Sequence, residues 1–248
     1  FDFQRDVPTC AAARDGSCLT LAQKLAIEPI FKGGATLRNG RPFYAGFPFD
    51  AGIGAAGIAF WEFTAPLALD SGAVGAIFKV PPSTLSLSAG PAFSLGLDID
   101  ATHAELFATN ATYTESAMAF MTPPDATELN DVRRRGAKML VYHGVSDPIF
   151  SVADTEAWYR GVDHSSGGRA GDFVSFYRVP GMGHCSGGPA TDQTDYITPL
   201  VAWVEQGTAP ESIVVSARGA GNPGGVNAEL PATWSATRTR PLCAHPKV

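Results

Sequence analysis

Two short runs of apolar residues in the second half of the chain have the length and composition of buried strands. Residues 138–144 read KMLVYHG and residues 172–181 read DFVSFYRVPG, and each run ends at a glycine. A third run follows at 211–219, ESIVVSARG. Because short apolar runs rich in β-branched and aromatic residues and bounded by glycine are typical of strands, we predict three strands here.

The segments between these runs carry a helical period. Residues 151–162, SVADTEAWYRGV, open with Ser151 or Asp154, whose side chains are of the kind that caps helix N-termini. Residues 191–207, TDQTDYITPLVAWVEQG, form a second amphipathic pattern that ends at a glycine. Pro199 interrupts it, so we expect the regular helix to start near this residue or to kink there. The apolar positions that share one face are 196, 197, 200, 201 and 204.

The first half of the chain has no such regularity. Residues 32–100 are rich in Gly, Ala, Pro, Ser and aromatic residues, and a stretch such as FPFDAGIGAAGIAFWEF keeps neither the helical nor the strand period for long. This predicts irregular packed structure with short helices. The simplest division is therefore an irregular, partly helical region over residues 1–128 and an α/β region over residues 129–248, where strands and helices alternate.

Composition places the chain among globular proteins and argues against two classes of partner. Of 248 residues, 45% are hydrophobic and 17% are charged. The formal charge is −6, and the basic residues are scattered apart from RRR at 133–135, so we expect neither a nucleic-acid partner nor a membrane surface. No apolar run is long enough to span a bilayer. The first residues, FDFQRDVPTC, lack the basic and apolar regions of a signal peptide, so we expect a mature, processed or cut chain.

The four cysteines suggest one local cross-link. Cys10 and Cys18 bracket a short loop that contains a glycine, AAARDGS, whereas Cys185 and Cys243 stand alone. We therefore predict a Cys10–Cys18 disulfide. No C-x-x-C or paired histidine spacing occurs, so no metal site is predicted. A disulfide implies an oxidising compartment, which predicts a secreted or periplasmic protein.

Two polar residues follow the first two predicted strands. Asp147 comes after the strand at 138–144, and His184 comes after the strand at 172–181 in VPGMGHCSGG. Functional side chains of open α/β sheets lie beyond the carboxyl ends of strands, and an acid followed by a histidine is the order of an α/β-hydrolase triad whose nucleophile lies upstream. Taken singly, an Asp in SDP is commonly a turn or capping residue, and a histidine among glycines is commonly a loop residue; the joint pattern favours a catalytic pair. The histidines without this context are interpreted as structural or exposed: His103, His143, His164 and His245.

Three longer stretches resemble a known enzyme family. YHGVSDPIFS, VPGMGHCSGGP and LVAWVEQGTAPESI, in this order and spacing, resemble the C-terminal portion of the tannase and feruloyl esterase family, whose members include a bacterial hydrolase of mono(2-hydroxyethyl) terephthalate. The resemblance extends upstream through DVRRRGAKMLVYHG, LDIDATHAELFATN, PFDAG and the loop between the first two cysteines, and it is weakest across 55–95. It implies that Asp147 and His184 are the acid and base of a Ser-His-Asp triad. Residues 129–248 would then be the C-terminal part of an α/β-hydrolase catalytic domain, and residues 1–128 a portion of its lid domain.

The same resemblance implies that the nucleophile lies elsewhere. In the family the serine sits in a C-S-x-G-G motif, and the cysteine of this motif is bonded to the cysteine directly after the catalytic histidine, here Cys185. The chain has no such motif, because CSGGP at 185–189 has a proline in place of the last glycine. Ser186 and Ser146 also lack the strand-to-helix elbow that exposes a nucleophilic serine.

Two further expectations come from this resemblance. Cys243 matches a C-terminal cysteine whose partner lies further downstream, and the calcium-binding loop of the lid lies before Phe1, so a structural calcium is expected in the complete lid with its ligands outside this chain. We therefore expect either a chain truncated at both ends, or the later half of a precursor cut into two chains, with the serine-bearing half linked through Cys185.

The function that the resemblance implies is hydrolysis of small aromatic esters, such as those of gallate, ferulate or related acids; which acid is preferred stays open. Catalysis of this type needs no cofactor. Flat apolar walls suit an aromatic acyl group, although aromatic clusters also serve simply as core. The alternatives are a non-catalytic fragment or binding module that lacks a nucleophile, and a structural protein that has lost its chemistry. The candidate substrate-binding residues are Phe150, Phe60, Trp61 and Phe63.

Overall fold

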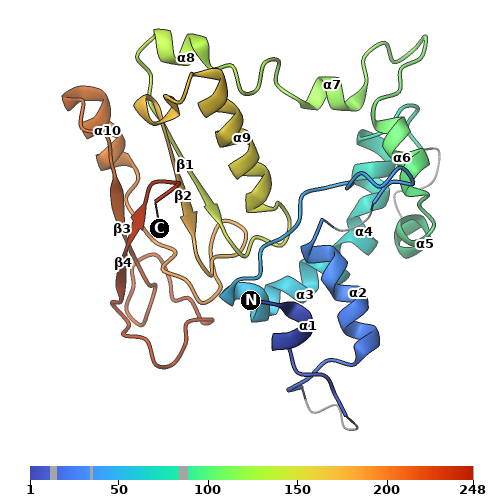
Figure 1. Cartoon of the computed structure of the whole chain (residues 1–248), viewed down its shortest axis with the longest axis horizontal. Helices are drawn as coiled ribbons and strands as arrows, with labels where there is room; N and C mark the ends of the chain where they lie inside the picture. Colours follow the sequence, from blue (N-terminus) through green and yellow to red (C-terminus); the bar gives the residue numbers. More distant parts are fainter. Residues whose placement is uncertain (12–15, 34–35, 84–88, 248) are drawn as a thin grey trace.

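The computed structural model describes residues 1–11, 16–33, 36–83 and 89–247 (Figure 1). The α-helices are α1 (Phe3–Asp6), α2 (Leu21–Phe31), α3 (Ala56–Phe63), α4 (Ala65–Gly72), α5 (Gly90–Leu95), α6 (Ile99–Leu106), α7 (Ala117–Met121), α8 (Asn130–Arg134), α9 (Val152–Ser165) and α10 (Ile197–Gln206). Short 3₁₀ or π-helical turns are η1 (Ala51–Gly54), η2 (Ala73–Ile77) and η4 (Ala170–Asp172). The strands are β1 (Met139–Gly144), β2 (Val174–Val179), β3 (Ser212–Ser216) and β4 (Thr239–Cys243).

Residues 1–128 are called the first segment. Its described residues form short helices joined by irregular chain, as the mixed composition predicts. In Figure 1 the helices α1–α6 lie on one side of the molecule, and the strands with α9 and α10 lie on the other. Within the described ranges, no helix has both the length and the apolar character that crossing a membrane requires. The division of the chain at residue 128 stays a prediction.

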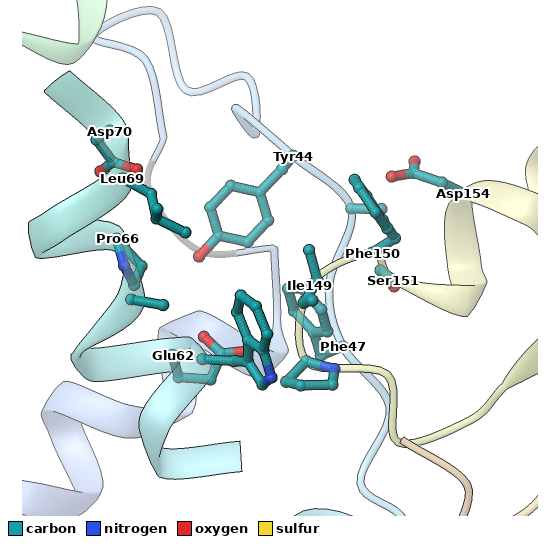
Figure 2. Close-up of a pocket in the computed structure, with 14 residues that line it drawn as sticks. Tyr44, Phe47, Glu62, Pro66, Leu69, Asp70, Ile149, Phe150, Ser151 and Asp154 are labelled. Carbon is teal, nitrogen blue, oxygen red and sulfur yellow. The ribbon is translucent and has the colours of Figure 1, made fainter. Parts of the chain in front are cut away.

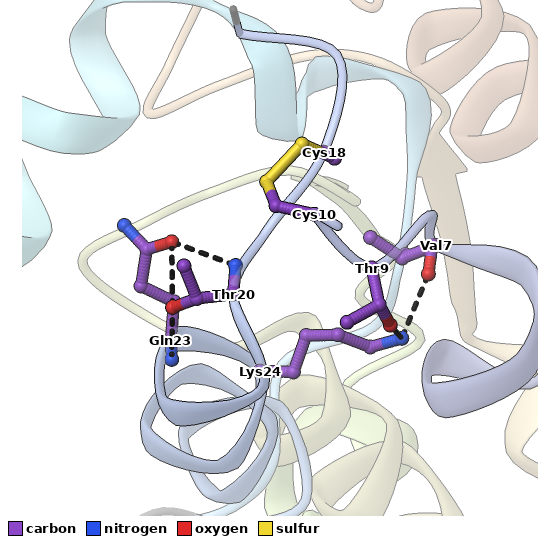
Figure 3. Close-up of a disulfide and its surroundings, with 7 residues drawn as sticks. All are labelled: Val7, Thr9, Cys10, Cys18, Thr20, Gln23 and Lys24. Carbon is purple, nitrogen blue, oxygen red and sulfur yellow. Dashed lines mark hydrogen bonds between the residues drawn. A yellow bond between two sulfur atoms is a disulfide. The ribbon is translucent and has the colours of Figure 1, made fainter. Parts of the chain in front are cut away.

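The start of the first segment is fixed by a disulfide, a helix cap and a buried lysine (Figure 3). The predicted Cys10–Cys18 bond is present. Just after it, Thr20 and Gln23 form a capping box at the N-terminus of α2, because each side chain bonds the backbone N–H of the other residue. Lys24 on α2 is 1% exposed, and its Nζ donates to neutral oxygens at 2.6–3.0 Å. These bonds satisfy an otherwise costly buried charge and tie the N-terminal chain to α2. The oxygens belong to Gln4, Val7 and Thr9.

The α/β fold predicted for the second half is confirmed. Strands β1 and β2 pair in parallel, with Met139 opposite Val174 and Gly144 opposite Val179. Helix α9 connects them and begins at the predicted cap, because the Ser151 side chain accepts a hydrogen bond from the backbone of Ala153. A parallel register brings the carboxyl ends of both strands to the same edge of the sheet. The loops that follow β1 and β2 therefore meet.

The core lies on both faces of β2. On one face, Val152, Tyr159 and Val162 of α9 pack with Val174 and Phe176. On the other face, the buried side chains of Tyr177 and Val179 join the core residues of β3 and β4, which are Ile213, Val215 and Leu242. Each such side chain contributes about 1.5–3 kcal/mol when it leaves water, so burial on both faces holds β2 firmly in place.

The third predicted strand forms, but it does not extend the β1–β2 sheet. Strand β3 pairs antiparallel with β4 in a separate two-stranded sheet. The sequence did not predict β4, because TRPLC is short, contains a proline and has three exposed positions. This second sheet lies beside β2, since the backbone N–H of His245 donates to the carbonyl of Phe176 at 2.7 Å.

Helix α10 is confirmed with the boundaries that its sequence suggests. Pro199 occupies the first turn, where its missing N–H costs no intrahelical hydrogen bond. Gly207 ends the helix in the left-handed region with φ 72°.

Candidate active site

The loops that follow β1 and β2 lie against each other at the sheet edge. The backbone N–H of Ser146 donates to the carbonyl of Met182 at 3.0 Å. Gly144 allows this approach, because a Cβ atom on it would lie 2.4 Å from the carbonyl oxygens of both Met182 and Gly183. A glycine at the end of β1 is therefore what lets the two loops touch, and it sets how closely the side chains they carry approach each other.

These loops bring Asp147 and His184 together. Nδ1 of His184 lies 2.9 Å from Oδ2 of Asp147. The other carboxylate oxygen, Oδ1, accepts hydrogen bonds from the backbone N–H groups of Ile149 and Phe150 at 2.8 and 3.1 Å. The Asp147 side chain is 5% exposed, whereas that of His184 is 37% exposed. A buried acid thus orients a histidine that faces the solvent, with its Nε2 on the edge of the ring opposite Asp147.

A second histidine, His143, also contacts Asp147. Its Nε2 lies 2.9 Å from the carbonyl oxygen of Phe150 and 3.3 Å from Oδ2 of Asp147, and its Nδ1 lies 2.7 Å from Oγ1 of Thr155. Since Nε2 faces two acceptors, it carries the proton, and the Thr155 hydroxyl donates to Nδ1 when the ring is neutral. Sequence reasoning placed His143 among the structural histidines; its place at the carboxyl end of β1 was the one signal that pointed to the site.

The environment of Asp147 keeps its carboxyl group ionised. Burial by itself raises the pKa of this group. The hydrogen bonds from the side chains of His143 and His184 and from the backbone of Phe150 and Ile149 outweigh burial and lower the pKa from 3.8 to about 2. At neutral pH Asp147 is therefore an anion that accepts hydrogen bonds from both histidines.

The loop after His184 is held by side chains from the C-terminal part of the chain. The backbone N–H of Gly187 donates to Asp192 at 2.8 Å, and that of Gly188 donates to Glu229 at 2.6 Å. Asp192 is paired in turn with Arg218 at 2.6 Å, which raises the pKa of that guanidinium group. These contacts could not be predicted from the sequence, because residues 192, 218 and 229 come together only in the folded chain.

A cavity of about 500 Å³ opens beside Asp147 and is shown in Figure 2. Residues of the loop before α9 form one wall, and residues of α3 and α4 form the opposite wall. Its aromatic lining comes from both walls and from the chain before η1: Tyr44, Phe47, Trp61 and Phe150. Trp61 and Pro148 also line a smaller cavity of about 110 Å³ that contains His184. The large aromatic cavity therefore adjoins the histidine of the candidate pair.

Three carboxyl groups add polarity to the large cavity: those of Glu62, Asp70 and Asp154. Burial raises the pKa of Glu62, and it raises the pKa of Asp70 despite an opposing hydrogen bond from Ser94. No lysine or arginine belongs to the lining among the described residues. The cavity therefore suits groups that donate hydrogen bonds better than groups that carry negative charge.

Two of the four aromatic residues singled out from the sequence line this cavity. Phe150 lies with its ring centroid 5.6 Å from that of His184, and Trp61 faces the cavity from α3. Phe60 and Phe63 lie on the same helix but outside the lining, with 51% and 55% of their surface exposed. Successive helical residues are rotated by about 100°, so neighbours of Trp61 point elsewhere.

The structure also shows why two nearby serines are unsuitable nucleophiles. Ser146 is buried, and its Oγ donates to Asp50 at 2.6 Å and accepts from the backbone N–H of Gly52 at 3.0 Å. Ser186 is exposed on the loop that carries His184, not on a turn between a strand and a helix.

The remaining histidines lie outside the candidate pair. His103 on α6 lies with its ring centroid 5.1 Å from that of Phe107, and His164 is in the last turn of α9. His245 packs against Tyr159 and Phe176, where burial lowers its pKa.

The other two cysteines are both unbonded. Cys185 is exposed and has φ 65°, an uncommon conformation for a residue other than glycine, and Cys243 is partly buried. Among the described residues, no group of three or more His, Cys, Asp or Glu side chains is arranged to hold a metal ion.

Comparison with known proteins supports the family inferred from the motifs. A family model described as "Tannase and feruloyl esterase" matches residues 1–248. The mono(2-hydroxyethyl) terephthalate hydrolase of Piscinibacter sakaiensis is 34% identical over 256 residues, which cover 96% of this chain and 40% of the relative.

Solved structures show the same fold at lower identity. An esterase from Aspergillus oryzae superposes with a TM-score of 0.59 at 20% identity over 97% of this chain and 45% of the other. Feruloyl esterase B from the same organism gives 0.57 at 18% identity over 96% and 45%. The chain thus spans less than half the length of these relatives.

Proposed function

Because the chain belongs to the tannase and feruloyl esterase family, we propose that it supplies the acid and the base of a serine-type carboxylic ester hydrolase that acts on esters of aromatic acids. The observation that carries this proposal is the 2.9 Å contact between Nδ1 of His184 and Oδ2 of the buried Asp147. Residues 129–248 would form the C-terminal part of the catalytic domain, and the first segment would form part of a lid over the substrate.

The proposed mechanism is acyl transfer. Nε2 of His184 takes the proton of a serine hydroxyl as that serine attacks the ester carbonyl, and then gives the proton to the departing alcohol. A water molecule next attacks the acyl-enzyme, with His184 again accepting a proton. Asp147 remains ionised throughout, because its hydrogen bonds hold its pKa at about 2. Its charge fixes the Nδ1–H tautomer and stabilises the imidazolium that forms in each step.

We infer that the nucleophile comes from polypeptide outside these 248 residues. The sequence contains no C-S-x-G-G motif, and both Ser146 and Ser186 lie in unsuitable positions. Within the described ranges the sheet ends at β1, and such an edge accepts another strand. Cys185, exposed directly after His184, is positioned to bond a cysteine beside the serine. The partner of this chain would thus be the serine-bearing part of the same enzyme, either continuous with it or linked through Cys185.

The proposed substrate is a small aromatic ester. The aromatic lining of the 500 Å³ cavity supplies flat apolar walls for an acyl group, and Phe150 lies between this cavity and His184. Galloyl and feruloyl esters both belong to this proposed substrate class. The disulfide in the first segment fits a secreted or periplasmic enzyme. A structural calcium would belong to a part of the lid outside these residues.

The test is hydrolysis of methyl gallate and methyl ferulate by the complete enzyme. The proposal predicts saturable hydrolysis with an initial burst of alcohol, and loss of activity in His184→Ala. Intact mass with and without reductant, measured on protein from its source, identifies the second part: a heavier species that releases this chain on reduction indicates a bridge. If the mass equals these 248 residues in both conditions and no ester is cleaved, the chain is a non-catalytic module and the proposal fails.

A further inference from the structure

Asp50 of the first segment reaches both loops that carry the candidate catalytic pair. Its Oδ2 accepts a hydrogen bond from Oγ of Ser146 at 2.6 Å and another from the backbone N–H of Gly181 at 2.5 Å. Ser146 directly precedes Asp147, and Gly181 lies three residues before His184. A single oxygen atom of the first segment is therefore bonded to the loop of the acid and to the loop of the base.

The chain around Asp50 is shaped for this contact. Asp50 precedes η1, a position where its side chain would ordinarily cap the turn, but it makes no capping bond there. Two residues later, the backbone N–H of Gly52 donates to Oγ of Ser146 at 3.0 Å. A Cβ atom on Gly52 would lie 2.4 Å from that oxygen and 2.5 Å from the carbonyl oxygen of Gly181. Only a glycine fits, so the chain enters the space between the two loops as closely as its backbone allows.

These contacts do more than fill space. A carboxylate forms stronger and shorter hydrogen bonds than a neutral acceptor, and it constrains both donors at once. The hydroxyl of Ser146 makes two hydrogen bonds to the first segment, because it accepts from the backbone N–H of Gly52 and donates to Asp50. The Asp147 loop and the Gly181 turn, which already touch through Ser146 and Met182, are thus also joined by a carboxylate that belongs to neither loop.

From this geometry we propose that Asp50 is a positioning residue that aligns Asp147 with His184 and so makes their alignment depend on the docking of the first segment. This inference rests on the proposed function. Asp50 is not among the residues that line the aromatic cavity or the small cavity of His184, so its effect on substrate is indirect. Its removal is therefore expected to alter turnover and not substrate affinity.

Two substitutions separate hydrogen bonding from charge. Asp50→Ala removes both bonds, whereas Asp50→Asn removes the charge but leaves an amide oxygen able to accept from Ser146 and Gly181. A matched control is Trp158→Phe. It removes the bond from Nε1 of Trp158 to the carbonyl of Ala126 at 2.8 Å, which also joins α9 to the first segment but lies away from both loops.

The experiment uses the complete enzyme and measures kcat and KM for an aromatic ester, the melting temperature, and the NMR signal of the Nδ1–H proton of His184. Asp50→Ala is expected to lower kcat by about 10- to 100-fold with little change in KM, since small misplacements of catalytic groups cost rates of this order. It should also move the signal of this proton upfield, because the hydrogen bond to Asp147 loosens. Asp50→Asn should recover most of both properties. Trp158→Phe should lower the melting temperature without altering kcat or the Nδ1–H signal.

Each outcome decides the matter. An Asp50→Ala enzyme that is folded and has an unchanged kcat and an unchanged Nδ1–H signal of His184 overturns the inference, and so does an Asp50→Asn enzyme that is as impaired as the alanine variant. If the wild-type enzyme cleaves no ester, the proposed function fails, while the Nδ1–H signal of His184 in the same three variants still tests the role of Asp50.

Discussion

Replacing Asp147 by asparagine changes the charge and the hydrogen bonding of the candidate pair while keeping its shape. If the asparagine oxygen faces His184, its NH₂ group points at the backbone N–H groups of Ile149 and Phe150, which need an acceptor. If the NH₂ group faces His184 instead, Nδ1 must become the acceptor. The proton then sits on Nε2, and the histidine can no longer take a proton from the serine.

The expected loss follows from these two orientations. The hydrogen bonds that lower the pKa of Asp147 from 3.8 to about 2 favour its ionised form by about 2 kcal/mol. The second orientation of the asparagine keeps the hydrogen bonds from the backbone N–H groups of Ile149 and Phe150, so it should be the preferred one. The tautomer of His184 that carries its proton on Nε2 then dominates. In a serine protease triad this tautomer costs about 10⁴-fold in kcat, which corresponds to about 5.5 kcal/mol. We expect a loss of similar size for Asp147→Asn, with KM nearly unchanged.

The assay compares burst and steady-state hydrolysis of an aromatic ester by the complete enzyme and this variant. Asp163→Asn is the matched control, because its Oδ1 accepts from the backbone of Ala170 at 3.0 Å, far from the pair. The control should keep full activity. A folded Asp147→Asn enzyme within tenfold of the wild-type kcat would refute the assignment of Asp147.

Four further outcomes are expected. His143→Leu removes one hydrogen bond to Asp147, so the pKa of Asp147 should rise and kcat should fall by about tenfold, measured as a pH–rate profile. Phe150→Ala should lower kcat/KM for aromatic esters by about tenfold but leave acetyl esters unaffected, and it should hardly alter stability because the side chain is 61% exposed. Gly144→Ala should destabilise the fold by about 1–3 kcal/mol in urea titrations, because its Cβ would meet two carbonyl oxygens. The pKa of Asp147 is lower in the folded state, so its ionisation contributes about 2 kcal/mol to the free energy of unfolding above pH 4, and this contribution is lost as the pH falls towards 2. The urea midpoint of the wild-type enzyme should show this loss, and that of Asp147→Asn should not.

Much of the fold of residues 129–248 was predictable because its signals are local. The apolar runs of β1 and β2, the cap at Ser151 and the glycine after α10 each act within a few residues. Strand β4 escaped prediction, because a short segment with a proline becomes a strand only when β3 pairs with it.

The same distinction applies to the candidate site. Asp147 and His184 were recognisable from their places after two strands and from the motifs around them. His143 was not, because its contact with Asp147 depends on the turn between them. Trp61 and Phe60 are neighbours in the sequence, yet only Trp61 lines the cavity, since the rotation of α3 decides which side chain faces it.

The sequence alone determined strands β1, β2 and β3, the order of the candidate acid and base, and the family, because these depend on residue type and spacing along the chain. Only the tertiary structure decided that Asp50 and Gly52 enter between the two loops. Along the chain, Asp50 is 96 residues from its partner Ser146 and 131 residues from its partner Gly181. Hydrogen bonds over such separations leave no periodic trace in a sequence, because either partner could have bonded water until packing fixed both in place.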